Sequence, residues 1–513
     1  MQSLKFIGTL LVALGANSLH AQDLTADTLA QDTEQQLTLQ WLEQQHIGKR
    51  FYDGYFQQAG LKRYERAANY TDLSMGYHNS TQDLYLQQTG AGSQGYQIGT
   101  KSYQRVSNSG FQLWGEAFYE NTKIKDQRFN EQIDYDKIYP YVLSDSVGGD
   151  LNQERYYIQG GMAKQVEDWD YGLSASYLAN QAYRKVDPRP INTSSDLKIQ
   201  LASSYQLNTK YRLGIALDGE KYIQQSSVNF VSQLFQSPLY HDAGFGANNL
   251  LLMSYSSTQH MSYSYGGSMT LIPANQQGLY ASLKYLKTDL DKSVSGIYAP
   301  VSSFQQQQVK VAVGYNKSFS EGASLKLDAT AAAQKKTGEE SIFYIDPSRN
   351  SLQLLSNNET FSDRQEHYTF NALWSQDRVN YSWNILLKTA YDKQDTYYLL
   401  PERQQQYDRF QSAIYGQLLK PLSKGLISAR VGYGLMKHSN AQASWDMSSA
   451  PEQVQAMLLS NYKYLTTDRQ FYSGEVRYDV KLSKGLQVFV IAQGSQTTRI
   501  KQQEYSLRFG FLF

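Results

Sequence analysis

The sequence contains no cysteine among its 513 residues and no excess of either charge, with 48 Lys and Arg against 47 Asp and Glu. An exported protein without cysteine has no disulfide framework, so its stability must come from packing or from hydrogen bonds between strands. Nucleic-acid binding favours a basic excess. The charge balance therefore gives no support to a nucleic-acid partner.

Long hydrophobic runs are also missing beyond the first part of the chain. Residues 6–16 are predominantly apolar, follow a single charge at Lys5 and precede Ala21, which is typical of a secretory signal peptide at residues 1–21. Cleavage after Ala21 removes Lys5 and leaves 47 basic and 47 acidic residues. No cysteine follows the run, which excludes a lipoprotein anchor. No later run approaches the roughly 20 apolar residues of a transmembrane helix.

Tyrosine is abundant, with 42 residues, and from about residue 68 apolar residues alternate with polar or small ones. In residues 309–316, Val and Tyr at odd positions alternate with Lys, Ala, Gly and Asn at even positions. The same period of two occurs in residues 211–218, 427–435, 472–480 and 505–513. It is typical of strands whose two faces meet different environments. A soluble sandwich of this size would bury more continuous apolar strands.

The connections between these segments alternate between two lengths. Short connections with hairpin-turn composition occupy residues 107–110, 167–170, 207–210, 274–277, 320–322, 377–378, 422–425 and 483–485. Long connections occupy residues 123–151, 183–193, 224–260, 290–304, 337–364, 394–405 and 439–468. The sequence therefore predicts an all-β fold, a transmembrane antiparallel β-barrel of about 18 strands (roughly 16 to 20), with short periplasmic turns and long extracellular loops. Residues 84–87, Leu-Tyr-Leu-Gln, could add a strand.

Three segments organise the chain: the signal peptide at 1–21, an N-terminal segment at 22–67 and the barrel at 68–513. The N-terminal segment is rich in Gln, Asp and Thr and could form a short helix at residues 38–45. It is expected on the periplasmic side, where it could plug the lumen. Its apolar residues that would then lie inside the barrel are Trp41, Leu42, Phe51, Tyr52, Tyr55 and Phe56.

The two faces of each strand are expected to meet lipid and lumen. Lipid offers no partner to a backbone amide, so a spanning sheet must close, with its apolar face outward and Tyr and Trp in interfacial girdles. A slip of one residue would move lumen charges into lipid, at about 2–4 kcal/mol for each Arg or Lys near the midplane. The predicted lumen-facing residues are Arg212, Asp218, Lys310, Lys326, Asp328, Arg430, Arg477, Asp479 and Arg508.

The chain ends on a strand-like segment with aromatic residues at Tyr505, Phe509, Phe511 and Phe513, interrupted by Leu512. This ending resembles the C-terminal strand signal of Gram-negative outer-membrane barrels. The resemblance implies recognition by the barrel-assembly machinery. It also implies a multi-pass protein of the bacterial outer membrane, with both termini in the periplasm.

A second resemblance rests on residues 139–150, Tyr-Pro-Tyr-Val-Leu-Ser-Asp-Ser-Val-Gly-Gly-Asp, and on Asp-Pro-Arg-Pro at residues 187–190. These segments resemble a family of outer-membrane barrels classed as a domain of unknown function. Members are often encoded with TonB-dependent transporters. The resemblance implies an accessory role in nutrient or iron uptake, with a TonB-dependent transporter and surface lipoproteins as partners. It implies no catalytic residues.

No residue pattern indicates an enzyme, a metal site or a cofactor. The histidines form no HxxxH or HExxH motif. Residues 145–152 combine Asp, Asn and Gly without the spacing of a calcium loop, which favours a structural turn. The candidate binding residues in the long loops are Tyr135, Tyr139, Tyr141, Arg189 and His241. Exposed aromatics often mark partner or sugar surfaces, but we favour packing of the loops on one another.

The sequence leaves three functions open. The barrel could be an accessory component of a TonB-dependent uptake complex, a free-standing diffusion porin, or a surface scaffold or adhesin. Outer-membrane lipids and lipopolysaccharide are expected around it in each case. The N-terminal segment discriminates between the first two, because aromatic residues folded inside the barrel would weaken the porin hypothesis.

Overall fold

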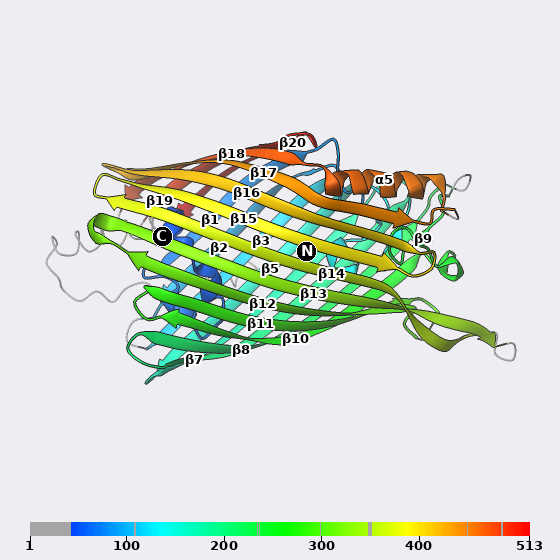
Figure 1. Cartoon of the computed structure of the whole chain (residues 1–513), viewed down its shortest axis with the longest axis horizontal. Coiled ribbons are helices and arrows are strands. Elements are labelled where there is room, and N and C mark those ends of the chain that lie inside the picture. The colour runs from blue at the N-terminus through cyan, green and yellow to red at the C-terminus, as the bar shows by residue number, and fades with distance from the viewer. Residues whose placement is uncertain are drawn as a thin grey trace.

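The computed structural model describes residues 43–106, 109–232, 234, 236–297, 299–346, 351–448, 450–483 and 486–513. Eighteen antiparallel strands form one sheet, and its last strand pairs with its first, so the sheet closes into a barrel (Figure 1). The predicted fold class and strand number are confirmed. None of the helices in these ranges is long and apolar enough to span a membrane. The expected signal peptide, Trp41 and Leu42 lie outside the described residues.

The barrel strands follow one another around the sheet in chain order. They are β1 (Tyr70–Thr81), β2 (Ser93–Arg105), β3 (Phe111–Gln127), β5 (Gly149–Val166), β6 (Trp169–Tyr183), β7 (Arg189–Gln206), β8 (Tyr211–Asn229), β10 (Ser257–Pro273), β11 (Gly278–Val294), β12 (Ser302–Ser318), β13 (Ala323–Asp346), β14 (Ser351–Arg378), β15 (Tyr381–Tyr398), β16 (Arg403–Leu422), β17 (Gly425–Trp445), β18 (Arg469–Ser483), β19 (Leu486–Thr497) and β20 (Gln502–Leu512). The remaining elements are α3 (Ile47–Arg50), α4 (Tyr135–Ile138), α5 (Glu452–Thr466), the 3-10 helices η1 (Asp53–Phe56), η2 (Lys62–Tyr64), η3 (Leu250–Leu252) and η4 (Ser320–Gly322), and the strand pair β4 (Leu143–Ser144) and β9 (Tyr240–His241).

Several stretches expected as long loops are strand. Much of residues 290–304, 337–364 and 394–405 belongs to β11 to β16, because a strand that extends beyond the membrane can be polar on both faces and then loses its period-two signal. Only roughly 9–11 residues are needed to cross the hydrocarbon, whereas β13 and β14 have 24 and 28. Their distal parts pair only with each other and project as a hairpin (Figure 1). Residues 84–87 form part of the β1–β2 connection and add no strand.

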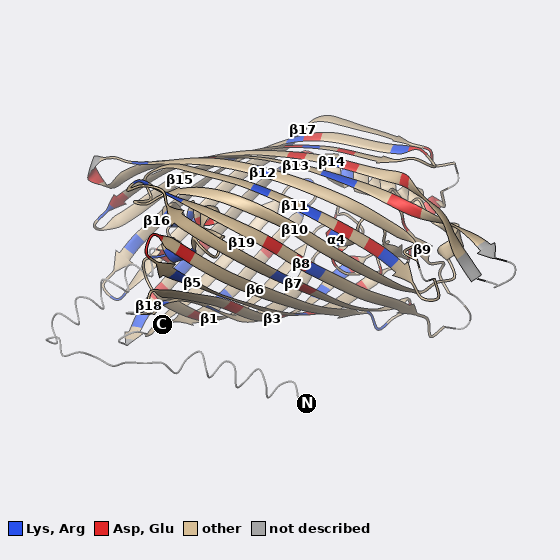
Figure 2. Cartoon of the chain, turned by 90° about the horizontal axis from the view of Figure 1, so that it is seen from below, with Lys and Arg blue, Asp and Glu red and all other residues tan. Residues whose placement is uncertain are grey.

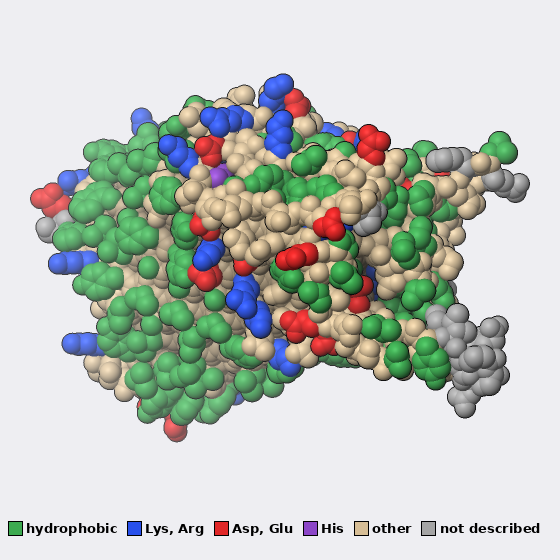
Figure 3. All heavy atoms as spheres, turned by 45° about the vertical axis from the view of Figure 1, so that its right-hand side comes forward, with side chains coloured by type: hydrophobic (Ala, Val, Ile, Leu, Met, Phe, Trp, Pro, Cys, Tyr) green, Lys and Arg blue, Asp and Glu red, His purple; other side chains and the backbone are tan. Residues whose placement is uncertain are grey.

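The outer face carries an apolar belt between two aromatic zones. Hydrophobic side chains cover the barrel toward the short turns, and polar and charged ones gather near the long connections (Figure 3). Outward tyrosines near the long connections make lateral ring contacts, such as Tyr119 with Tyr156 at 4.9 Å and Tyr433 with Tyr472 at 5.3 Å. We call this set the tyrosine girdle: Tyr77, Tyr96, Tyr119, Tyr156, Tyr177, Tyr265, Tyr285, Tyr368, Tyr391, Tyr433, Tyr472 and Tyr505. Closed barrels with such belts and girdles are found in bacterial outer membranes, which defines this fold as an outer-membrane β-barrel.

Candidate functional site: the closed lumen

The short-turn end of the lumen is filled by residues 43–68, which we call the N-terminal plug. Its blue segments lie inside the barrel at the end that carries the C-terminus (Figure 1). Tyr52, Tyr55 and Phe56 are buried, and the Tyr52 ring stacks on Tyr280 of β11 at 4.1 Å. Gly314 of β12 makes room for this contact, because a Cβ atom there would lie 2.7 Å from the Tyr52 ring. A glycine of the alternating strand pattern thus accommodates the plug.

Hydrogen bonds tie the plug to inward-facing side chains of distant strands. The Tyr55 hydroxyl donates to Asp328 Oδ2 at 2.7 Å. The Tyr64 hydroxyl donates to Asp170 Oδ2 at 2.7 Å, and the same carboxylate accepts from Arg212 Nη1 at 2.6 Å. Polar residues of the lumen wall therefore act as anchors for the plug rather than as a bare channel lining.

Side chains of β13, β14 and β18 hold the start of the plug. His46 Nε2 lies 2.9 Å from Asp377 Oδ1. Gln45 donates to Asp479, and Lys326 donates to the Gly48 carbonyl. Residues 43–45, the described part of the helix expected at 38–45, are helical.

All nine predicted lumen residues face the barrel interior, but they fall into two groups. Six contact the plug or its anchors: Arg212, Asp218, Lys326, Asp328, Arg477 and Asp479. Lys310, Arg430 and Arg508 lie outside these contacts, and Lys310 and Arg508 are exposed although they point inward. Charges of both signs are interspersed along the strands (Figure 2). The lumen between its two ends is therefore lined by charges of both signs.

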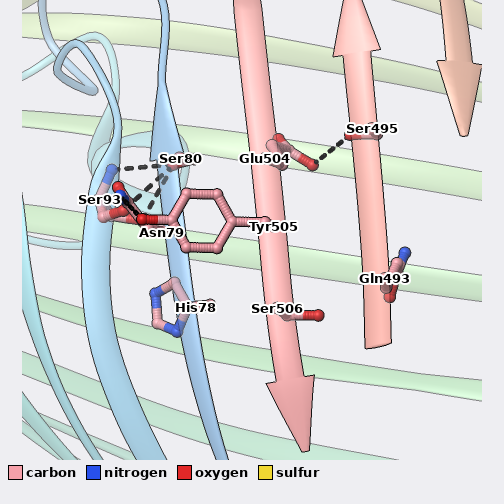
Figure 4. Close-up of a pocket in the computed structure, with 9 residues that line it drawn as sticks. All are labelled: His78, Asn79, Ser80, Ser93, Gln493, Ser495, Glu504, Tyr505 and Ser506. Carbon is pink, nitrogen blue, oxygen red and sulfur yellow. Dashed lines mark hydrogen bonds between the residues drawn. The ribbon is translucent and has the colours of Figure 1, made fainter. Parts of the chain in front are cut away.

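A polar pocket of about 270 Å³ lies at the seam where β1 meets β20. It is lined by His78, Asn79, Ser80, Ser93, Gln493, Ser495, Glu504, Tyr505 and Ser506 (Figure 4). Ser495 Oγ donates to Glu504 at 3.1 Å, whereas the side chains of Tyr505 and Asn79 pair on the outer face, with Asn79 Nδ2 donating to the Tyr505 hydroxyl at 2.6 Å. The pocket lining offers hydroxyl, amide and carboxylate groups but no buried charge.

The long-connection end is filled by loops that turn inward. We call residues 129–148 and 236–256 together with α5 the loop closure. The short strands β4 and β9 pair inside the barrel mouth. Ile138 and Val142 are fully buried among Tyr222, Phe304 and residues of α5 such as Val454. The apolar run Ile138 to Leu143 is therefore part of the buried core. Its high content of apolar residues is the feature of the sequence that indicates a packed connection.

Buried polar groups of the wall fasten the loop closure. Lys336 Nζ donates to the Tyr139 carbonyl at 2.8 Å, and Arg403 Nη1 donates to the Phe245 carbonyl. Arg184 Nη1 donates hydrogen bonds to both carboxylate oxygens of Glu131, at 2.8 and 2.9 Å, and both side chains are buried. Sequence reasoning did not single out these residues, because a polar residue inside a barrel has no signature that distinguishes an anchor from a water-exposed wall.

The structure places the loop binding candidates mostly inside this closure. Tyr141 and His241 are buried at 1% exposure, and Tyr135 and Tyr139 pack against the same core. Arg189, at the start of β7, lies outside this core and is partly exposed, with its Nε 2.6 Å from Asp187 Oδ1. These tyrosines therefore contribute mainly packing to the closure, with Tyr135 and Tyr139 only partly buried.

His241 is held neutral in the closure. Its Nε2 lies 2.8 Å from the Tyr255 carbonyl, and Nδ1 is buried without a partner. Burial, with the nearby charge of Lys292, lowers the pKa of His241 to about 3. Burial also raises the pKa of its neighbour Asp242 to about 6. Within the part of the chain that the structure describes, no three His, Asp or Glu side chains are grouped as a metal site.

The C-terminal aromatics Tyr505, Phe509, Phe511 and Phe513 point outward and are exposed. Leu512, which interrupts their alternation, points inward and is fully buried in an apolar cluster with Tyr70 and Tyr103. Its side chain is therefore part of the apolar packing at the short-turn end.

Comparison with known proteins identifies the family. Residues 58–513 match the model of the "Family of unknown function (DUF6850)", so the chain belongs to that family. No curated protein matches the chain in sequence.

Several solved structures share the barrel architecture at low identity. The ferric-catecholate import receptor Fiu from E. coli K12, in its open form, is 7% identical, with 86% of this chain and 82% of that chain covered and a TM-score of 0.38. The siderophore receptor PiuA from Acinetobacter baumannii is 9% identical, with 87% and 82% covered and a TM-score of 0.37. The outer membrane transporter YddB from Escherichia coli is 8% identical, with 86% and 81% covered and a TM-score of 0.40. Similarity at this level does not extend to ligands or partners.

Proposed function

We propose that this protein is a sealed accessory barrel of a TonB-dependent uptake complex for nutrients such as iron, with both termini in the periplasm. The observation that carries the proposal is the double closure of the lumen, by the N-terminal plug at one end and the loop closure at the other. A free-standing porin needs an open path. A barrel whose own chain fills both mouths is better suited to docking than to diffusion.

The projecting β13–β14 hairpin supports docking on the loop side. Its exposed apolar side chains, Ile342, Tyr344, Leu354 and Leu355, lie beyond the last pairing with β12 and β15. Clustered exposed apolar groups mark protein contact surfaces. The proposed partners are a TonB-dependent transporter and surface lipoproteins, and the proposal assigns no catalytic step to this chain.

Purification in a mild detergent, followed by mass spectrometry of co-purifying proteins, tests this role. We expect a stoichiometric transporter or lipoprotein with the wild-type protein and at least a several-fold loss of it from the variant Leu354→Ser/Leu355→Ser. Leu217→Ser, on the lipid face of β8, is the matched control for exposed leucine. Repeated recovery of the barrel alone would refute the accessory role.

A further inference from the structure

One lysine of the loop closure reaches back to the barrel wall. Lys137 lies in α4, and its Nζ donates to Asp196 Oδ2 of β7 and, at 2.7 Å, to Glu220 Oε1 of β8. The same Nζ lies 4.7 Å from the centroid of the Tyr222 ring. At Lys336, in contrast, the wall supplies the cation and the loop supplies a backbone carbonyl. Lys137 therefore brings a cation from the loop to a wall site that is built from two carboxylates and an aromatic ring.

The register of two neighbouring strands forms this wall site. Asp196 pairs with Tyr222 across β7 and β8, and Lys198 pairs with Glu220 two residues nearer the turn between these strands. All four side chains face the lumen, because the alternate residues, such as Leu197, point to lipid. Lys198 Nζ lies 3.6 Å from Asp196 Oδ2 and 3.3 Å from Glu220 Oε2. The wall therefore holds two carboxylates and only one ammonium group of its own.

This balance leaves one negative charge, which Lys137 neutralises. The next inward carboxylate of β8, Asp218, does not alter the balance, because Lys284 Nζ lies 3.7 Å from its Oδ2. Asp196 is buried, and its second oxygen, Oδ1, has no hydrogen-bond partner among the described residues. A buried charge that loses its partner is costly. When Lys137 moves away with its loop, the site therefore favours another cation in its place.

A second contact of the same turn docks α4 on the wall. Asp134, the residue before α4, accepts hydrogen bonds from the Tyr222 hydroxyl at 2.9 Å and from Ser194 Oγ at 2.8 Å. Both donors are uncharged. The contacts of Asp134 and Lys137 break together when this loop leaves the mouth, but only the loss of Lys137 leaves the wall site with an unbalanced charge.

We propose that Asp196, Glu220 and Tyr222 form a binding site for a primary ammonium group, which Lys137 occupies as a tethered ligand while the mouth is closed. Carboxylates accept strong hydrogen bonds from an ammonium group, and an aromatic face attracts its charge. A soluble primary amine competes with Lys137 for the site and thereby favours the open loop. The site lies on the inner wall, so the proposal is independent of the accessory role.

Hydrogen exchange of residues 129–148 tests the site in the full-length barrel in detergent, with n-butylammonium chloride as the probe. A ligand that binds only the open form raises its population by the factor 1 + [L]/Kd. We expect exchange of this segment to increase with amine concentration, several-fold at concentrations well above Kd. Sodium chloride at the same concentration should have a much smaller effect. Equal acceleration by both salts indicates charge screening alone and overturns the proposal.

Three variants separate the tethered ligand from the wall site. Lys137→Met removes the tethered ammonium, so exchange of residues 129–148 should be about tenfold faster without amine. It should no longer respond to amine, because nothing competes with the probe. Glu220→Gln removes the excess negative charge and should also abolish the response, whereas the control Lys284→Met removes a lumen lysine outside the site and should keep it.

Two results with these variants overturn the proposal. The first is wild-type exchange of residues 129–148 in Lys137→Met, and the second is an undiminished response to amine in Lys137→Met or Glu220→Gln. Far-ultraviolet circular dichroism confirms that each variant forms the barrel. The comparison of the two salts on the wild-type protein decides the question independently of any variant.

Discussion

Single residues decide how closely the chain can fill its own lumen. Gly314 accepts the Tyr52 ring because it has no Cβ, and Leu512 contributes its side chain to the cluster beneath the plug. Both lie on the inward face, where the period-two pattern predicts only that a residue is not lipid-facing. The sequence could therefore predict the direction of these side chains, but not the segment that covers them.

Substitution Gly314→Leu should loosen the plug. The added side chain would clash with Tyr52, and overpacking of this kind costs about 1–3 kcal/mol. We expect faster hydrogen exchange in residues 43–66. Gly160→Leu is the control, because a Cβ atom added at Gly160, on the outer face of β5, would have no protein atom within 4 Å. Equal exchange in both variants would show that Gly314 does not control the plug.

Acidification should weaken the loop closure through His241. Its folded pKa of about 3 lies below the ordinary value near 6.5, so neutral His241 contributes fully above that value and its contribution is lost as the pH falls from 6.5 toward 3. In this window, the free energy that stabilises the closure in the wild-type protein should fall, relative to the variant His241→Gln, by up to about 1.4 kcal/mol per pH unit. Hydrogen exchange of residues 236–256 measures this loss. Asp242 titrates in both proteins, so an identical pH dependence would contradict the assignment to His241.

At the scale of elements, the barrel strands were predictable and the closures were not. Strands such as β12 are recognisable because lipid and lumen impose opposite chemistry on alternate residues. The loops at 129–148 and 236–256 face neither lipid nor a regular strand partner, and they pack through long-range contacts such as that of the Tyr139 ring with Phe361 at 5.6 Å. No local period encodes such contacts.

The Glu131–Arg184 pair should hold the first of these loops in place. Arg184→Leu leaves a buried carboxylate without its partner, which costs about 3–5 kcal/mol. The double variant Glu131→Leu/Arg184→Leu should recover most of that loss, because it leaves no unpaired charge. Thermal unfolding of the three proteins in detergent gives the comparison. A double variant as unstable as the single one would show that the pair acts through specific hydrogen bonds beyond charge compensation.

At the scale of the whole molecule, the fold combines a lipid-facing wall with a lumen filled at both mouths by segments of the same chain. The wall follows from closure, which leaves no unpaired edge in lipid. The two closures fill both mouths of a barrel wide enough for a channel, and charges of both signs line the lumen between them. Under the proposed function, the interactions are made by the outer surface and the projecting hairpin and not by the lumen.

Planar-bilayer conductance tests this central claim most directly. The account predicts no large steady current from the wild-type protein, and none after removal of residues 43–66 alone, because the loop closure still fills the other mouth. Steady current should arise only when residues 129–148 are also replaced by a short Gly-Ser linker. A large steady current from the wild-type protein would contradict the closed lumen.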